Sequence, residues 1–246
     1  MFNKRGQITL FIVIGIVIVL VGSIYFFVVR NSQDLNYLGP FQLQTEEIKS
    51  HVEDCLNQVA SSAIYRIGAR SGYLELKENY YPTLYDNTNY LYYENVSSLH
   101  VNGEIEHRIS KYVDDHIIEC VNFSLFNNFE IEFKETKTET VLGYDNIFVY
   151  LDWPLFIKKD NVERKIDEFE IKIDVRFLTI YDAVKNIIES TEKHPGIIDQ
   201  VLLFNQNVTY IDYTYTNETV VYLITDEKSM LNNKPYYQFV FATKVS

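Results

Sequence analysis

The chain has 246 residues, with 34 acidic and 22 basic side chains, two cysteines and 47% hydrophobic residues. This composition is typical of a folded protein of one or two domains. It excludes a disulfide-dense mini-protein, a zinc-cluster protein and a protein that binds nucleic acid through bulk positive charge. The formal net charge is −12 and no acidic residue precedes position 31, so an acidic body follows a basic, apolar beginning.

Residues 8–29 form an uninterrupted run without a charged side chain. As a helix rising about 1.5 Å per residue they span roughly 33 Å, which matches the hydrocarbon core of a bilayer. A cleaved signal peptide is the alternative, but its apolar stretch is shorter, and the first alanine that could mark a cleavage site is Ala60. We therefore predict a retained transmembrane helix, with the lipid bilayer as its partner.

The charges on either side of this run predict its orientation. Lys4 and Arg5 precede it, and cytoplasmic flanks carry an excess of basic residues, so the short tail is expected inside the cell and the body outside. The predicted layout is a single-pass cell-membrane protein with a cytoplasmic tail over residues 1–7, a transmembrane helix over 8–29, a linker over 30–43 and an extracytoplasmic, extracellular domain over 44–246.

The segment KRGQIT, residues 4–9, followed by the apolar run, resembles the class III signal peptide of archaeal type IV pilin-like proteins. The resemblance implies that a prepilin peptidase cuts after Gly6 and leaves Gln7 as the first residue. Two features differ from that family: Phe11 stands where many pilins carry glutamate, and Gly39-Pro40 interrupts the helix. Further along, residues 55–74 and 234–242 are similar to segments of uncharacterised membrane-anchored archaeal proteins, which implies a recurring extracytoplasmic domain without an assigned activity.

Apolar residues recur every three or four positions in two segments, about 45–70 and 104–123, which predicts two amphipathic helices. Cys55 and Cys120 each lie on the apolar face of one of them. In an exported domain a disulfide between the two is favoured; the alternative is two free, buried cysteines that pack as small hydrophobic residues.

The segment between these helices is unusually rich in tyrosine. Residues 80–93 read YYPTLYDNTNYLYY and are interpreted as a loop. Tyrosine gives a large contact area at a low entropic cost, so the loop is a candidate contact patch; the alternative is a loop packed down on the domain. The tyrosines of this candidate patch are Tyr80, Tyr81, Tyr85, Tyr90, Tyr92 and Tyr93.

From Phe129 onwards apolar and polar residues alternate, which predicts antiparallel strands with one face in water. The clearest strand covers about 168–177, and Trp153-Pro154 is read as a strand end. A third helix starting near Thr179 is followed by strands at about 208–215, 220–225 and 236–243. The predicted fold class is therefore α+β, with about three helices and an antiparallel sheet in one extracytoplasmic domain. Four N-x-[ST] sequons are candidate N-glycosylation sites: Asn95, Asn122, Asn207 and Asn217.

No motif for catalysis or for a cofactor stands out. The five histidines lack a second ligand at the spacing of a helical metal site, and no G-x-S-x-G elbow or phosphate-binding glycine loop occurs. We predict that the protein is not an enzyme and that it has no catalytic residues, no metal and no cofactor. The favoured function is a membrane-anchored cell-surface protein with a non-catalytic envelope or interaction role. The alternatives are a type IV pilin-like accessory subunit, with partners in a filament, and a tethered extracellular hydrolase.

Overall fold

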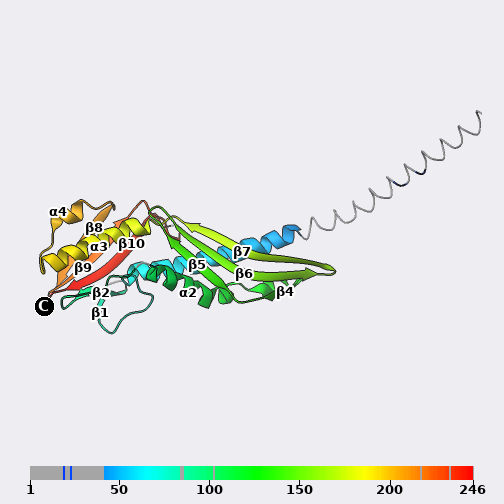
Figure 1. The fold of residues 1–246 in the computed structure, drawn as a ribbon, viewed down its shortest axis with the longest axis horizontal. Coiled ribbons are helices and arrows are strands. Elements are labelled where there is room, and N and C mark those ends of the chain that lie inside the picture. The colour runs from blue at the N-terminus through cyan, green and yellow to red at the C-terminus, as the bar shows by residue number, and fades with distance from the viewer. Residues whose placement is uncertain are drawn as a thin grey trace, which may run out of the picture. The chain divides into compact units, whose positions relative to one another are not determined.

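The computed structural model describes residues 42–83, 86–101, 103–216, 218–232 and 234–245, together with Val19 and Ser23. The chain divides into two compact units, Met1–Ile48 and Lys49–Ser246. The described residues contain four α-helices and two β-sheets, so the α+β class predicted from the sequence is confirmed (Figure 1).

The structure does not support the predicted transmembrane helix over residues 8–29 or the single-pass placement of the chain in the cell membrane. Among the described residues, no helix combines the length and the apolar character needed to cross a membrane. The helix of residues 42–69 carries charged side chains such as Glu46, Lys49 and Glu53, and the next two helices have 17 residues each. Of the predicted span itself, the description includes only Val19 and Ser23.

One sheet has six strands and is mixed rather than purely antiparallel. The strands β2 and β10 run parallel to each other, and the other pairs are antiparallel. Strand β10 is central because it pairs with β2 on one side and β9 on the other. In spatial order the strands are β1 (Tyr80–Pro82), β2 (Asn87–Tyr93), β10 (Tyr237–Lys244), β9 (Thr219–Asp226) and β8 (Tyr210–Thr216), with β3 (Val96–Ser97) paired to β2.

The tyrosine-rich segment between the two long helices supplies strands β1 and β2 of this sheet, so the prediction of a loop is wrong for these residues. Strand β2 places Tyr90 and Tyr92 opposite Ala242 and Thr243 of β10. The local sequence of a tyrosine-rich strand resembles that of a tyrosine-rich loop. Pairing with a strand that is distant in the sequence decides between the two, so the local pattern does not predict it.

The second sheet has four strands, β4 (Glu130–Phe133), β5 (Lys137–Leu142), β6 (Ile147–Lys159) and β7 (Val162–Ile173). Strand β6 pairs with β7 along one side and with both β5 and β4 along the other. The sequence predicts a strand end at Trp153-Pro154, but β6 continues through it with a register shift between Asp152 and Leu155. Proline is tolerated at such an irregularity, and the buried Trp153 indole donates a hydrogen bond to the Lys134 carbonyl at 2.9 Å.

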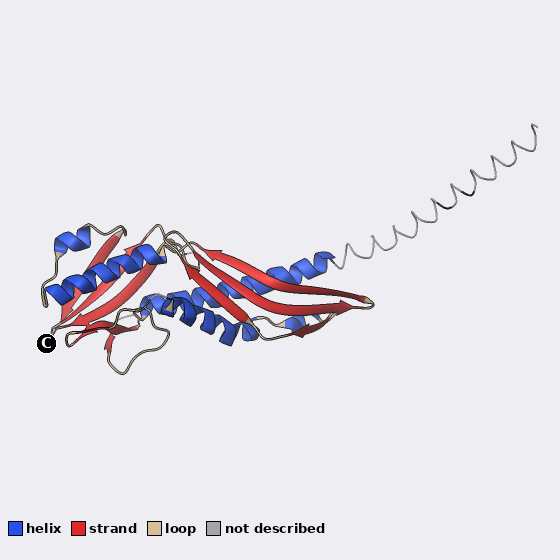
Figure 2. Ribbon diagram, in the orientation of Figure 1, coloured by secondary structure: helices blue, strands red, loops and turns tan. Residues whose placement is uncertain are grey.

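Two helices run beside the four-stranded sheet: the helix of residues 42–69, in its part from Lys49 onwards, and α2 (Glu104–Cys120) (Figure 2). Helix α2 packs on β5, where the Ser110 hydroxyl hydrogen bonds to the Thr140 hydroxyl at 2.9 Å. Its apolar face is buried as the periodicity predicts. The apolar residues of this face are Ile105, Ile109, Val113 and Ile117.

Cys55 and Cys120 form a disulfide between these two helices, with their Cα atoms 5.7 Å apart. The pairing predicted from the sequence is confirmed, and the alternative of two free cysteines is excluded. Cys55 is only 5% exposed, so the bridge lies against the core where the helices meet.

Helix α3 (Phe177–Lys193) accompanies the six-stranded sheet, as does the short α4 (Gln200–Phe204), while a 3-10 turn, η1 (Phe123–Phe126), follows α2. Phe177 and Tyr181 of α3 each pack on Phe239 of β10, with ring centroids 6.1 Å apart in both pairs. The sequence predicts Phe177 as the end of a strand, but β7 ends four residues earlier. A buried apolar residue fits either pattern, so periodicity alone does not separate them.

The disulfide is expected to be the largest single constraint on the unfolded chain. Replacing both cysteines by alanine should lower the free energy of unfolding by about 4 kcal/mol, because the bridge closes a loop between residues 65 positions apart. Denaturant titration of the native chain, with and without reductant, and of the double variant measures this loss. A change below about 1 kcal/mol in both comparisons would contradict the expectation.

Candidate anion-binding site

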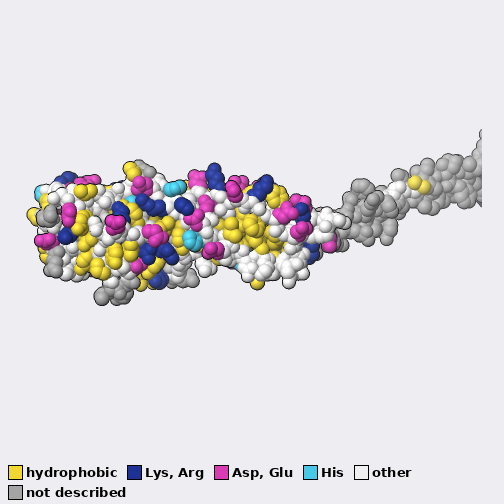
Figure 3. Space-filling view, turned by 90° about the horizontal axis from the view of Figure 1, so that it is seen from below, with side chains coloured by type: hydrophobic (Ala, Val, Ile, Leu, Met, Phe, Trp, Pro, Cys, Tyr) yellow, Lys and Arg dark blue, Asp and Glu magenta, His cyan; other side chains and the backbone are white. Residues whose placement is uncertain are grey.

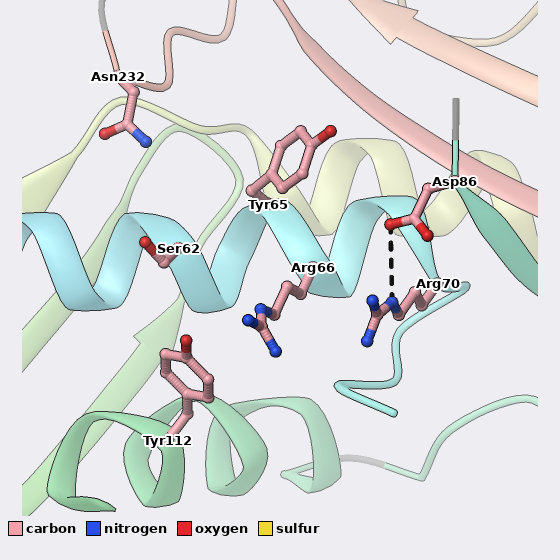
Figure 4. Close-up of a pocket in the computed structure, with 7 residues that line it drawn as sticks. All are labelled: Ser62, Tyr65, Arg66, Arg70, Asp86, Tyr112 and Asn232. Carbon is pink, nitrogen blue, oxygen red and sulfur yellow. Dashed lines mark ion pairs between the residues drawn. The ribbon is translucent and has the colours of Figure 1, made fainter. Parts of the chain in front are cut away.

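A hollow of about 420 Å³ lies beside the C-terminal part of the 42–69 helix and is the candidate functional site. Figure 4 shows two arginine guanidinium groups on one side of this helix, with Tyr112 rising toward them from α2. The lining residues are Ser62, Tyr65, Arg66, Arg70, Asp86, Tyr112 and Asn232.

The helix period and the disulfide together place these side chains. Arg66 and Arg70 are four residues apart, which puts them on the same helix face. Arg66 lies 11 residues after Cys55, and Tyr112 lies eight residues before Cys120. Moving forward along one helix therefore corresponds to moving back along the other, so the two helices are antiparallel and bring Arg66 to Tyr112.

Arg66 contacts an aromatic ring rather than a carboxylate. Its guanidinium carbon lies 5.4 Å from the centroid of the Tyr112 ring, within the range of a cation–π interaction. The ring of His116 stacks on the same tyrosine, with centroids 4.1 Å apart. Among the described residues, no carboxylate lies within ion-pairing distance of Arg66, so its N–H donors face the hollow without a counter-charge.

Arg70 is only partly neutralised. Its Nε lies 3.7 Å from a carboxylate oxygen of Asp86, close enough for an ion pair but too far for a hydrogen bond. Its Nη1 donates to the Leu74 carbonyl at 2.6 Å, while the buried Nε has no hydrogen-bond acceptor in the part of the chain that the structure describes. The hollow therefore holds two positive charges against one negative charge.

This arrangement suits an oxyanion. Guanidinium groups present N–H donors in a fixed fork that matches a carboxylate or a phosphate. The phenol of Tyr112 and the amide of Asn232 line the same hollow and supply neutral donors. Like charges four residues apart on a helix repel each other by about 0.2–0.5 kcal/mol, and a bound anion would relieve this repulsion.

A second polar cluster surrounds His100, whose side chain is only 1% exposed. Its Nε2 lies 2.8 Å from the Ser71 carbonyl and therefore donates, which leaves Nδ1 to accept from Arg108 at 2.9 Å. The Tyr181 hydroxyl accepts the His100 backbone N–H at 2.8 Å. Both ring nitrogens are engaged within the fold, so this cluster fixes a loop.

Burial lowers the pKa of His100 below its ordinary value, and the neighbouring Arg108 guanidinium acts in the same direction, against the opposing effect of the Ser71 carbonyl. Burial likewise raises the pKa of Tyr181 to about 12, so its hydroxyl keeps its proton. Gly72 permits this packing, because it has φ +88° and a Cβ there would lie 2.2 Å from the His100 Nε2.

The described tyrosines of the candidate contact patch do not form one exposed surface. Tyr80 is 44% exposed, whereas Tyr92 is 3% exposed and belongs to the core. Tyr90 packs edge-on against both Tyr81 and Tyr93, at centroid distances of 6.3 and 5.1 Å. Figure 3 shows hydrophobic side chains on one face of the molecule gathered in patches between charged side chains of both signs.

The three described sequon asparagines do not line the hollow. Asn95, Asn122 and Asn207 are exposed, and their glycosylation stays a prediction. Gly6, Gln7, Tyr85 and Asn217 lie outside the described residues.

No motif in the sequence marks Arg66 or Tyr112 as a site residue. The available signal was that Arg66 and Arg70 are the only arginines of the chain four residues apart. Tyr112 has no such signal, because only the disulfide between the helices brings it to Arg66.

Comparison with protein-family models, with curated proteins and with solved structures finds no match for this chain. Within the described ranges, no group of three or more His, Cys, Asp or Glu side chains is placed to hold a metal ion. The arginine hollow is therefore the feature of the described residues that points to a function.

Lowering the pH is expected to destabilise the fold through His100. Because its pKa is depressed in the folded chain, the unfolded chain binds more protons between the folded and the ordinary pKa. The stabilisation is complete above the ordinary histidine pKa of about 6.5 and is lost as the pH falls below it.

Urea titrations of the native chain and of His100→Gln between about pH 7.5 and about pH 5 measure this effect. The variant should be less stable at neutral pH but should lose less stability on acidification. His107→Gln, which removes an exposed imidazole from α2, is the control and should behave like the native chain. Equal pH slopes for the native chain and His100→Gln would disprove the assignment.

Proposed function

We propose that this protein is a non-catalytic binding protein whose arginine hollow holds an oxyanion, a carboxylate or a phosphate, presented by its partner. The observation that carries the proposal is the Arg66 guanidinium, which packs on Tyr112 and faces the hollow without a carboxylate among the described residues. The proposed function keeps the interaction role expected from the sequence and assigns that role to the arginine hollow.

The charge of the whole chain makes such an arginine pair informative. With 34 acidic side chains against 22 basic ones, carboxylates outnumber the positive groups they can neutralise. Among the described residues, only Arg70 of this arginine pair contacts a carboxylate, that of Asp86, so the pair is under-neutralised locally although the chain is acidic. A negatively charged ligand is the partner that this local excess of positive charge favours.

The most buried imidazole belongs to the fold and not to the hollow. His100 uses both ring nitrogens within the fold, to the Ser71 carbonyl and to Arg108, and it does not line the hollow. The hollow supplies hydrogen-bond donors and positive charge, which are means of binding. Cleavage after Gly6, on which the pilin-like alternative depends, lies outside the described residues and stays a prediction.

Replacing Arg66 by glutamine is expected to weaken oxyanion binding about ten- to a hundredfold, because a hydrogen bond to a charged group contributes about 1.5–3 kcal/mol. Sodium phosphate and sodium acetate are titrated separately against the full chain, with sodium chloride keeping the ionic strength constant. Binding raises the unfolding temperature in proportion to the logarithm of ligand concentration over Kd. The anion that gives the larger increase in unfolding temperature identifies the preferred ligand as a phosphate or a carboxylate.

Two further variants separate a site from a general salt effect. Lys193→Gln changes the net charge by the same amount but lies on α3, away from the hollow, and should keep the native shift. Arg66→Lys keeps the charge but loses the planar fork, and should bind with intermediate affinity. Phosphate stabilises many proteins without binding a site, so equal shifts for the native chain and Arg66→Gln would refute the proposal.

A further inference from the structure

Strand β8 is an edge of the six-stranded sheet, because it pairs with β9 along its length and has no strand on its other side among the described residues. Six of its seven residues are exposed, the exception being the half-buried Ile211. In an antiparallel ladder, alternate residues direct their N–H and C=O groups away from the partner strand. The outer side of β8 therefore presents backbone donors and acceptors that a further strand can pair with.

The other edges carry the features that normally prevent such pairing. Strand β1, at the opposite edge of the same sheet, has three residues and ends in Pro82. Strand β7, an edge of the four-stranded sheet, is lined with charged residues of both signs, including Glu163, Arg164 and Lys165. Strand β8 has seven residues, no proline and a single charged side chain, Asp212. Short length, proline and charge are the usual protections of an edge strand, and β8 has none beyond that one aspartate.

We propose that β8 pairs antiparallel with β8 of a second copy of this chain, so that two six-stranded sheets continue into one. This proposal is independent of the arginine hollow. Antiparallel pairing of identical strands requires a two-fold axis perpendicular to the sheet, which places each residue opposite a residue of the same face. Centring the axis on Tyr213 pairs all seven residues of β8.

The side chains of β8 are compatible with this register. On one face Ile211 lies opposite Tyr215, and Tyr213 lies opposite its own copy, so aromatic and apolar residues meet. On the other face Asp212 lies opposite Thr214, and no like charges face each other. Moving the axis to Asp212 would oppose two carboxylates and shorten the pairing, so the strand favours the register centred on Tyr213.

Exposed apolar residues beside the edge extend the same surface. Helix α4 lies on the Tyr213 face of the sheet, where the Gln200 amide donates to the Tyr213 hydroxyl at 3.2 Å. On this helix Val201 is 71% exposed and Phe204 is 90% exposed. A second copy related by the two-fold axis carries its own α4 on the same face. Pairing of the two β8 strands therefore brings the exposed apolar residues of the two α4 helices closer to burial.

Two opposite changes at one exposed position test the register. Thr214→Asp places aspartate opposite Asp212 twice across the axis and should weaken dimerisation about tenfold. Thr214→Lys places lysine opposite Asp212 twice and should keep or strengthen it. Sedimentation velocity on the full chain, produced without glycans and solubilised identically for each variant, gives the dimer fraction against concentration.

A cross-link gives a second readout that does not depend on charge. Tyr213→Cys places two cysteines directly opposite each other, and mild oxidation should yield a covalent dimer. Thr214→Cys is the matched control, because its two copies lie about 7–8 Å apart on a diagonal, beyond the reach of a disulfide. A native chain that stays monomeric, a dimer unchanged by Thr214→Asp, or equal cross-linking of the two cysteine variants would overturn the proposal.

Discussion

The covalent bridge between Cys55 and Cys120 fixes the antiparallel pair of helices on which the candidate site depends. Further along the pair, Arg66 and Tyr112 face each other from opposite helices, and their cation–π contact forms a second connection between them. A helix pair joined at two separate points cannot slide along its axis without breaking one of them. The hollow is therefore held by the same constraint that holds this part of the core.

The loop that follows the 42–69 helix is fixed in a different way, by polar groups in a buried position. His100 joins the Ser71 carbonyl to Arg108, and the Ser71 hydroxyl reaches the Asn89 carbonyl of β2 at 2.7 Å. Each of these groups would be costly to bury alone, so the network is stable only when it is complete. It connects the end of the first helix, the start of the six-stranded sheet and α2, and it keeps Arg70 and Asp86 beside the hollow.

The sequence predicts elements whose pattern is local and misses those decided by distant partners. The helical period of the apolar residues closely predicts the 42–69 helix and α2, and the positions of the two cysteines on these helices predict the disulfide. The alternation of apolar and polar residues predicts strand β7 but extends the predicted strand to Phe177. In the structure, tertiary packing makes Phe177 the first residue of helix α3. The sequence does not predict the tyrosine-rich strand β2, because its neighbour β10 comes some 150 residues later in the chain. The predicted membrane-crossing helix depends on residues 8–29, of which the structure describes only Val19 and Ser23. Arg66 and Tyr112 meet only through the tertiary fold.

The central position of β10 has a consequence for the order in which the chain acquires its structure during synthesis. Strands β1, β2 and β3 leave the ribosome early, yet the strand that joins them to β9 and β8 is made only when residues 237–244 appear. The four-stranded sheet, by contrast, is built from strands close together in sequence and can form first. Nascent chains therefore carry an open, tyrosine-rich ribbon until late in translation, and this long-range closure is the step expected to limit the folding rate.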